Sequence, residues 1–173
     1  GTWRTDMPYC EYPSPVGILT LVASDEGLQA VWWPDDARST HVGEWQPDHP
    51  VLAQASAELD EYFAGRRTTF DVPLNPTGTE FQRAAWAVLR TIPYAQTMTY
   101  AQQAARLGDP AKARAVGAAN GRNPISIIVP CHRVVGASGA LTGFAGGLDA
   151  KQWLLQFELD TASTSGHHTT SVS

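Results

Sequence analysis

The sequence predicts an α+β fold, in which a small N-terminal sheet-and-helix scaffold domain precedes a mostly helical domain. Three observations support this prediction. Strand-like runs with turn residues fill the first third, two helix-capping signatures follow in the second half, and an apolar run then leads into a Pro-Cys-His-Arg segment. We place the two domains at residues 1–78 and 79–160, and we expect a disordered, Ser/Thr-rich tail over 161–173.

Composition excludes several classes of protein. The chain has 173 residues, of which 43% are hydrophobic and 17% charged, as is typical of a globular protein. No stretch approaches the roughly 20 apolar residues of a membrane helix, and no secretory signal is visible, so we expect a cytoplasmic protein, or a nuclear one in a eukaryote. The two cysteines, Cys10 and Cys131, are too few for a disulfide framework or a cysteine-based zinc site. We expect neither a metal nor a cofactor.

Charge is distributed unevenly along the chain. The net charge is −5, yet residues 1–80 carry 4 Lys and Arg against 13 Asp and Glu, whereas residues 81–158 carry 8 against 3. The basic half is a candidate for binding a polyanion. Chance clustering explains the same split, and charge alone leaves both explanations open.

The N-terminal elements are predicted from strand and helix periodicity. Two β-type runs, Val16–Ala23 and Leu28–Trp33, flank an acidic turn and predict a hairpin. Apolar residues at helical spacing predict a helix from Pro50 to Phe63. A further strand is expected over Thr69–Leu74, and the Pro and Gly residues that follow it up to Gly78 mark the domain boundary.

The second domain begins with helix-start signals. The segments 79–82 and 99–102 both have the Thr-x-x-Gln pattern of a capping box, so we expect a helix to begin at each. Asp109-Pro110 opens a third helix, expected over 111–120. The second and third helices, joined by a short Gly-containing turn, have the pattern of a helix-turn-helix, although a helical hairpin packed into a core looks the same. A last helix is expected over 149–159.

The segment that carries chemistry is Pro130-Cys131-His132-Arg133. A buried Cys is usually a small hydrophobe, whereas a reactive Cys needs a base or a cation that stabilises its thiolate. His132 is the nearest base, but neighbours on a strand point to opposite faces, so contact requires a turn or a bridging water. Arg133 adds positive potential or holds a loop. The residues alone leave a catalytic and a structural Cys131 equally open.

A longer ordered set of motifs surrounds this segment. The set comprises Arg114-Ala115-Val116-Gly117, Asn123-Pro124, Ile127–Val134, Gly146-Gly147-Leu148, Lys151 and Glu158. With it, the chain resembles the O6-alkylguanine-DNA alkyltransferases, also called methylated-DNA–protein-cysteine methyltransferases, in outline over residues 12–158 and densely over 79–158. The resemblance implies a monomeric DNA-repair protein without a membrane partner. Its partner would be double-stranded DNA containing O6-alkylguanine, with O4-alkylthymine as a further candidate lesion.

The resemblance also implies a mechanism. Cys131 would attack the alkyl carbon on guanine O6 and keep the group as a thioether, so that each molecule acts once. His132 would take the thiol proton through a water, and Glu158 would orient His132. Tyr100 would donate a hydrogen bond to the departing base. Because the alkyl group is out of reach inside a stacked duplex, the nucleotide must be rotated out.

The resemblance assigns DNA contacts and a guanine pocket as well. Arg114 would fill the gap that the rotated nucleotide leaves, on a helix presented to the minor groove. The other expected DNA contacts on this helix are Lys112, Ala115, Ala118, Ala119 and Asn120. The expected pocket residues are Asn123, Val134, Phe144, Ala145, Gly146 and Lys151. Phe144 stands where the family usually has Tyr, which keeps the ring face but loses a hydroxyl and puts the alkyl-group preference in doubt.

Four other functions compete with this interpretation. A non-catalytic lesion sensor would flip the base without repairing it, but such relatives lack the nucleophile that Cys131 supplies. An engineered self-labelling variant would share every motif. A regulator would use the helix-turn-helix alone. A Cys-dependent hydrolase would need an oxyanion hole and would turn over past one equivalent of product.

Overall fold

The computed structural model describes residues 7–40 and 43–172. The chain forms two compact units, of which the first comprises residues up to Gly78 together with Pro124–Ile128, and the second comprises Thr79–Asn123 and the chain from Val129 onward. The return of 124–128 to the first unit departs from the division expected from the sequence. It results from long-range pairing, because the Val31 amide donates to the Pro124 carbonyl at 2.8 Å and the Trp33 indole donates to Ser126 Oγ at 3.1 Å.

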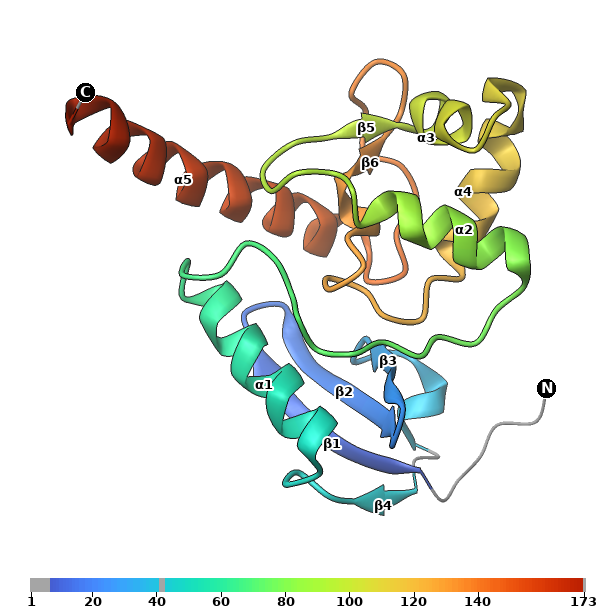
Figure 1. Ribbon diagram of the computed structural model, residues 1–173, viewed down its shortest axis with the longest axis vertical. Helices are drawn as coiled ribbons and strands as arrows, with labels where there is room; N and C mark the ends of the chain where they lie inside the picture. The colour runs from blue at the N-terminus through green and yellow to red at the C-terminus, as the bar shows by residue number, and fades with distance from the viewer. Residues whose placement is uncertain (1–6, 41–42, 173) are drawn as a thin grey trace. The chain divides into compact units, whose positions relative to one another are not determined.

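The first unit is built on a four-stranded sheet in the order β3-β2-β1-β4. The strands are β1 (Pro8–Ser14), β2 (Gly17–Ser24), β3 (Gly27–Trp32) and β4 (Glu44–Trp45). β2 pairs antiparallel with β1 and β3, and β4 runs parallel to β1. The structure confirms the expected hairpin as β2 and β3, and Figure 1 shows the helix α1 lying along one face of the sheet.

Helix α1 (Pro50–Phe63) has the bounds that its periodicity predicts. His49 caps it, because its Nδ1 accepts a hydrogen bond from the Val51 amide at 3.2 Å. The side chains of Leu52, Leu59 and Tyr62 are fully buried. Burial of this apolar stripe against the sheet forms the core of the first unit.

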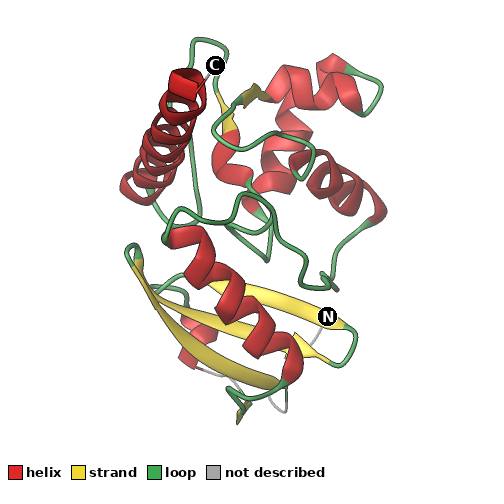
Figure 2. Cartoon of the chain, turned by 60° about the vertical axis from the view of Figure 1, so that its left-hand side comes forward, coloured by secondary structure: helices red, strands yellow, loops and turns green. Residues whose placement is uncertain are grey.

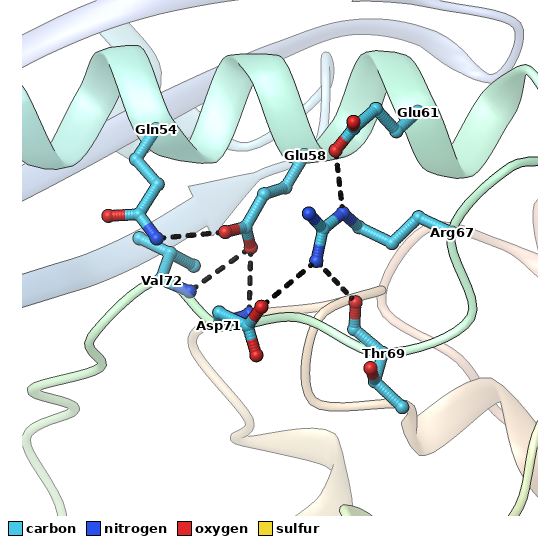
Figure 3. Close-up of polar contacts among 7 residues, drawn as sticks. All are labelled: Gln54, Glu58, Glu61, Arg67, Thr69, Asp71 and Val72. Carbon is cyan, nitrogen blue, oxygen red and sulfur yellow. Dashed lines mark hydrogen bonds and ion pairs between the residues drawn. The ribbon is translucent and has the colours of Figure 1, made fainter.

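The segment after α1 is not the strand that the sequence predicts. Within 69–74 only Leu74 makes a strand-like bridge, to Leu28. The buried Glu58 carboxylate accepts instead from the amides of Asp71 and Val72, at 2.9 and 3.1 Å, as Figure 3 shows. A helix carboxylate thus takes the amides of residues 71 and 72, and the segment pairs with the sheet only at its end, where Pro73 and Asn75 exchange backbone hydrogen bonds with Leu28.

The second unit is mostly helical, as Figure 2 shows. Its helices are α2 (Glu80–Leu89), α3 (Tyr100–Arg106), α4 (Ala113–Gly121) and α5 (Leu148–Val172), and its short parallel strands are β5 (Met98–Thr99) and β6 (Val134–Val135). Both predicted capping boxes are present, since Thr79 and Thr99 each exchange hydrogen bonds with the Gln three residues later. A 3₁₀ turn, Pro110–Lys112, precedes α4 where the sequence predicts its first helical residues.

Helix α5 extends beyond its expected end at 159. It continues to Val172, where composition predicts a disordered tail over 161–173. Residues 160–165 contain neither Gly nor Pro, so helical hydrogen bonding propagates from the packed turns, and Thr164 Oγ1 donates back to the Asp160 carbonyl at 3.0 Å. None of the helices in the described ranges is long and apolar enough to cross a membrane.

Candidate active site

A tight turn presents the cysteine and its neighbouring histidine. Cys131–Arg133 forms a single 3₁₀ turn, so Cys131 and His132 do not alternate across a strand. Asn123 Nδ2 donates to the Val129 carbonyl at 2.9 Å and holds the chain that leads into this turn. Cys131 is 7% exposed and His132 is fully buried. From the sequence, contact between Cys131 and His132 required either a turn or a bridging water, and the structure has a turn at this place.

The histidine is held by a carboxylate from α5. His132 Nε2 lies 2.7 Å from Glu158 Oε2, and both side chains are fully buried. The other ring nitrogen, Nδ1, has no hydrogen-bond partner among the described residues. The arrangement fixes the tautomer in which Nε2 carries the proton and Nδ1 has the free lone pair. Nδ1 is therefore the atom that can accept a proton.

Burial keeps this histidine neutral. It lowers the pKa of His132 below its usual value, and the charges of Arg133 and Lys151 lower it further, whereas the hydrogen bond and charge of Glu158 oppose the shift. A neutral imidazole at neutral pH is the form that works as a general base.

Arg133 donates hydrogen bonds to both oxygens of the same Glu158 carboxylate. Its Nε donates to Glu158 Oε1 at 2.8 Å, its Nη2 donates to Oε2 at 2.9 Å, and its Nη1 donates to the Ile92 carbonyl at 2.9 Å. Burial alone would raise the pKa of Glu158, but the hydrogen bonds and charges of His132 and Arg133 lower it well below its usual range. Arg133 is not among the site residues expected from the sequence. The one signal that could have indicated it is its position directly after Cys131 and His132.

Lys151 adds a buried positive charge to the site. It is 1% exposed, and its Nζ donates to the Thr142 carbonyl at 3.1 Å. Burial lowers the pKa of Lys151, and its electrostatic interaction with Cys131 acts in the opposite direction. The ammonium therefore lies within electrostatic range of the cysteine, where a positive charge favours a thiolate.

Strand pairing brings Tyr100 to the segment that follows Cys131. β5 pairs with β6 through Met98 with Val134 and Thr99 with Val135, and Tyr100 is the next residue along the chain. Its ring packs against α4, since a Cβ added at Gly117 would stand 3.7 Å from two ring carbons. Its hydroxyl shares a 2.7 Å hydrogen bond with Thr142 Oγ1.

The remaining pocket residues lie on the segment after Cys131. Val134 is fully buried, Phe144 and Gly146 are half-buried, and Ala145 is exposed. The Gly147 amide donates to the Phe144 carbonyl at 2.9 Å, and Gly147 has a φ of 89°, which closes a turn before α5. Phe144, Ala145 and Gly146, three of the six residues that the resemblance assigned to a guanine pocket, lie in this turn, whereas Val134 lies in β6 and Lys151 in α5.

The expected DNA-contacting residues on α4 and in the turn before it fall into an exposed group and a buried group. Lys112, Arg114, Ala115 and Ala118 are exposed. Ala119 and Asn120 are buried at 3% and 8% exposure and do not lie on the surface.

The two buried positions share the inward face of the helix with Val116, at spacings of three and four residues. Asn120 exchanges hydrogen bonds with Gln103 at 2.8 and 3.0 Å, and the Ala119 carbonyl accepts from the Trp86 indole at 2.8 Å. Residues 119 and 120 therefore join α4 to its neighbouring helices.

No metal-binding group is visible in the part of the chain that the structure describes. Over 7–40 and 43–172 there is no cluster of three or more His, Cys, Asp or Glu side chains placed to hold an ion. The site around Cys131 consists of Cys, His, Glu, Lys and Arg side chains. Together with the helix pair α3 and α4, these side chains define a class of protein, one that joins a helix-turn-helix to a cysteine followed by a carboxylate-bound histidine.

Comparisons with known proteins give the family. The model of the 6-O-methylguanine DNA methyltransferase ribonuclease-like domain matches residues 7–76, and that of the DNA binding domain of the same family matches residues 80–159. A Methanosarcina acetivorans methylated-DNA–protein-cysteine methyltransferase is 47% identical over 153 residues, covering 88% of this chain and 98% of the relative. The relative of the same name from Mycolicibacterium paratuberculosis is 48% identical over 152 residues, covering 88% and 92%.

Solved structures agree with these matches. The crystal structure of Mycobacterium tuberculosis OGT in complex with DNA is 46% identical, with a TM-score of 0.81, covering 89% of this chain and 94% of that one. The crystal structure of the Mycobacterium tuberculosis O6-methylguanine methyltransferase is 45% identical, with a TM-score of 0.80, covering 90% and 94%. The chain belongs to the 6-O-methylguanine DNA methyltransferase family, the methylated-DNA–protein-cysteine methyltransferases.

Proposed function

We propose that this protein repairs O6-alkylguanine in double-stranded DNA by transferring the alkyl group to the sulfur of Cys131. Membership of the family makes the chain a DNA-repair methyltransferase that transfers alkyl groups to a protein cysteine. The assignment to Cys131 is supported by its place beside His132 in the 3₁₀ turn. Cys10, the other cysteine, lies in strand β1 of the first unit, where burial and the charge of Glu11 raise the pKa of its thiol and disfavour a thiolate. O4-alkylthymine is a second substrate to test.

The observation that carries this proposal is the His132–Glu158 pair. Its 2.7 Å hydrogen bond leaves Nδ1 as the acceptor for a proton from the Cys131 thiol, relayed by a water molecule. The thiolate then attacks the alkyl carbon in line with the bond to O6. The S–C bond forms, the C–O6 bond breaks, and its electron pair stays on the guanine. The product is a thioether, which no group in the site can cleave, so each molecule acts once.

The exposed face of α4 supports the DNA part of the proposal. Arg114 carries positive charge on this face, and Lys112 adds a second exposed charge from the 3₁₀ turn just before α4. The small side chains of Ala115 and Ala118 allow a close approach to a groove. The target nucleotide rotates out of the stack to reach Cys131, and Arg114 takes the place of the missing base. We further propose that the protein acts as a monomer and works where chromosomal DNA lies, in the cytoplasm of a prokaryote or the nucleus of a eukaryote.

Intact-mass spectrometry tests the proposal directly. The protein is incubated with a duplex that carries one O6-methylguanine, beside the variants Cys131→Ser and Cys10→Ser. We expect a gain of one methyl group per molecule in the parent protein and in Cys10→Ser, and no gain in Cys131→Ser. Tight lesion-selective binding without a mass gain would favour a sensor instead. Product that keeps forming past one equivalent would favour a hydrolase.

A further inference from the structure

We propose that Thr142 is a positioning residue that turns the Tyr100 hydroxyl toward the departing guanine. The inference rests on the proposed function and adds a residue to its leaving-group side. It starts from the 2.7 Å hydrogen bond between Thr142 Oγ1 and the Tyr100 hydroxyl. The resemblance implies that the loop 142–147 lines the guanine pocket, but it assigns the Thr142 side chain no role.

Thr142 is held in place at three points. Its carbonyl accepts from the buried Lys151 ammonium at 3.1 Å. Its methyl carbon lies beside Gly136, 3.6 Å from the place where a Cβ at Gly136 would stand. Its hydroxyl contacts Tyr100. With the backbone and the methyl group fixed, the hydroxyl of Thr142 has a defined direction relative to the Tyr100 oxygen.

The direction of this hydrogen bond determines what Tyr100 can do. A phenol has a single hydrogen to donate. If Tyr100 donates it to Thr142, none remains for a base. If Thr142 donates to the Tyr100 oxygen, the phenolic hydrogen is free for an acceptor on guanine, and the two bonds strengthen each other. An acceptor that enters beside Tyr100 selects this second direction, and only two hydroxyl hydrogens need to rotate.

The resulting chain of donors acts on the leaving group. As the C–O6 bond breaks, its electron pair delocalises over O6 and the ring nitrogens of guanine. A hydrogen bond from Tyr100 stabilises that developing charge, and Thr142 strengthens the bond by donating to the Tyr100 oxygen. Thr142 touches neither His132 nor Glu158 through any hydrogen bond of the described residues, so its hydroxyl has no direct part in activating the thiol.

The test compares two methyl donors that give the same product. Single-turnover methylation of Cys131 is measured with an O6-methylguanine duplex and with methyl iodide, whose iodide leaves without a hydrogen bond. The variants are Thr142→Val, which keeps the shape but loses the hydroxyl, and Thr142→Ser, which keeps the hydroxyl. All are made in a Cys10→Ser background, and the methylated residue is located by peptide mass mapping, so that only methylation of Cys131 is counted.

We expect Thr142→Val to slow transfer from the duplex about tenfold, to leave the rate with methyl iodide unchanged, and to leave duplex affinity unchanged. Thr142→Ser should restore most of the rate. A Tyr100→Phe variant should be slow by itself, and adding Thr142→Val to it should cause no further loss.

Two results would overturn the inference. An equal slowing with both donors would mean that Thr142 supports the cysteine or the shape of the pocket. A full additional loss in the Tyr100→Phe background would mean that Thr142 acts independently of Tyr100. The parent protein, assayed with both donors, distinguishes these results from a failure of the proposed function. If methyl iodide methylated Cys131 but the duplex transferred no methyl group, the proposed function would be refuted, and this inference with it.

Discussion

Arg133 donates hydrogen bonds to both carboxylate oxygens of Glu158, at 2.8 and 2.9 Å. One of these oxygens, Oε2, also accepts a hydrogen bond from His132. The residue next to the histidine in the chain thus fixes the carboxylate that orients the histidine. The pair is buried, so neither charge is screened by water. The orientation of the general base therefore depends on a side chain that contacts neither the thiol nor the base of the DNA in the proposed mechanism.

Removing the guanidinium should destabilise the protein strongly. Arg133→Gln leaves the Glu158 carboxylate buried with one fewer cation and removes the bond to the Ile92 carbonyl. We expect the free energy of unfolding to fall by about 3–5 kcal/mol, measured by urea denaturation. Arg122→Gln, at an exposed position, is the matched control and should change it by less than about 0.5 kcal/mol. A decrease of less than about 1 kcal/mol in the free energy of unfolding of Arg133→Gln would contradict a stabilising role for the buried Arg133–Glu158 ion pair.

Glu158→Gln should impair the chemistry while DNA binding is retained. The amide keeps the volume of the side chain, but its NH₂ group can donate to His132 Nε2 and so stabilise the tautomer in which Nδ1 carries the proton. His132 then presents a protonated Nδ1 to the thiol, so it cannot accept the thiol proton. By analogy with catalytic triads, we expect single-turnover methyl transfer to slow by about 10²–10⁴-fold, with duplex affinity unchanged. Glu61→Gln, in the first unit, is the control and should transfer at the parent rate.

The pH dependence follows from the lowered pKa of His132. A histidine with its ordinary pKa of 6.5 would be half protonated at pH 6.5, whereas less than half of His132 is protonated there. We expect the rate of methyl transfer to fall by less than half between pH 7.5 and 6.5 and to reach its half-maximal value below pH 6.5. A rate that halves at pH 6.5 while the protein remains folded would show that the pKa is not lowered.

The same shift links acidity to stability. Because the unfolded chain binds the His132 proton at a higher pH than the folded chain, this contribution to stability is complete above about pH 6.5 and is lost as the pH falls below it. The lowered pKa of Glu158 adds a second loss, which begins as the pH falls through the usual value of 4.5. Urea midpoints at pH 7, 5.5 and 4 should decrease in that order, and Glu158→Gln should lack the part of the decrease between pH 5.5 and 4 that comes from protonation of the carboxylate.

Two positions on α4 should separate DNA binding from stability. Arg114→Ala removes an exposed charge, so we expect weaker duplex binding, a salt-dependence slope smaller by about one phosphate contact, and an unchanged free energy of unfolding. Asn120→Ala strands the buried amide of Gln103 and should lower the free energy of unfolding by about 1–3 kcal/mol. If Asn120→Ala weakened DNA binding without any loss of stability, its burial would not explain its role.

Ala95 holds a backbone conformation that suits glycine. Its φ is 64°, and its amide donates to Glu158 Oε1 at 3.3 Å. A Cβ in this region costs about 1 kcal/mol, so Ala95→Gly should raise the free energy of unfolding by up to about 1 kcal/mol without slowing transfer. Ala101→Gly, at an exposed position inside α3, is the opposite control and should lower it by about 1 kcal/mol.

Local patterns in the sequence predicted the elements whose causes lie within a few residues. The Thr79 and Thr99 caps were predicted correctly, because a capping box needs only residues three apart. The hairpin of β2 and β3 and the bounds of α1 follow from alternation and helical periodicity in the same way. The strand expected over 69–74 was wrong, because whether an extended segment pairs depends on what lies beside it, and there Glu58 takes its amides.

Near neighbours in the chain are enough to specify the capped helices, the turn signals and the adjacent Cys131 and His132. The tertiary structure decided which side chains complete the site. Arg133 and Glu158 are 25 residues apart, and Tyr100 and Thr142 are 42 apart. Folding also decided that Ala119 and Asn120 face the core of the second unit, while Arg114 faces solvent. The physical reason is that these contacts depend on which distant segments pack together, and periodicity within one helix does not specify its partners.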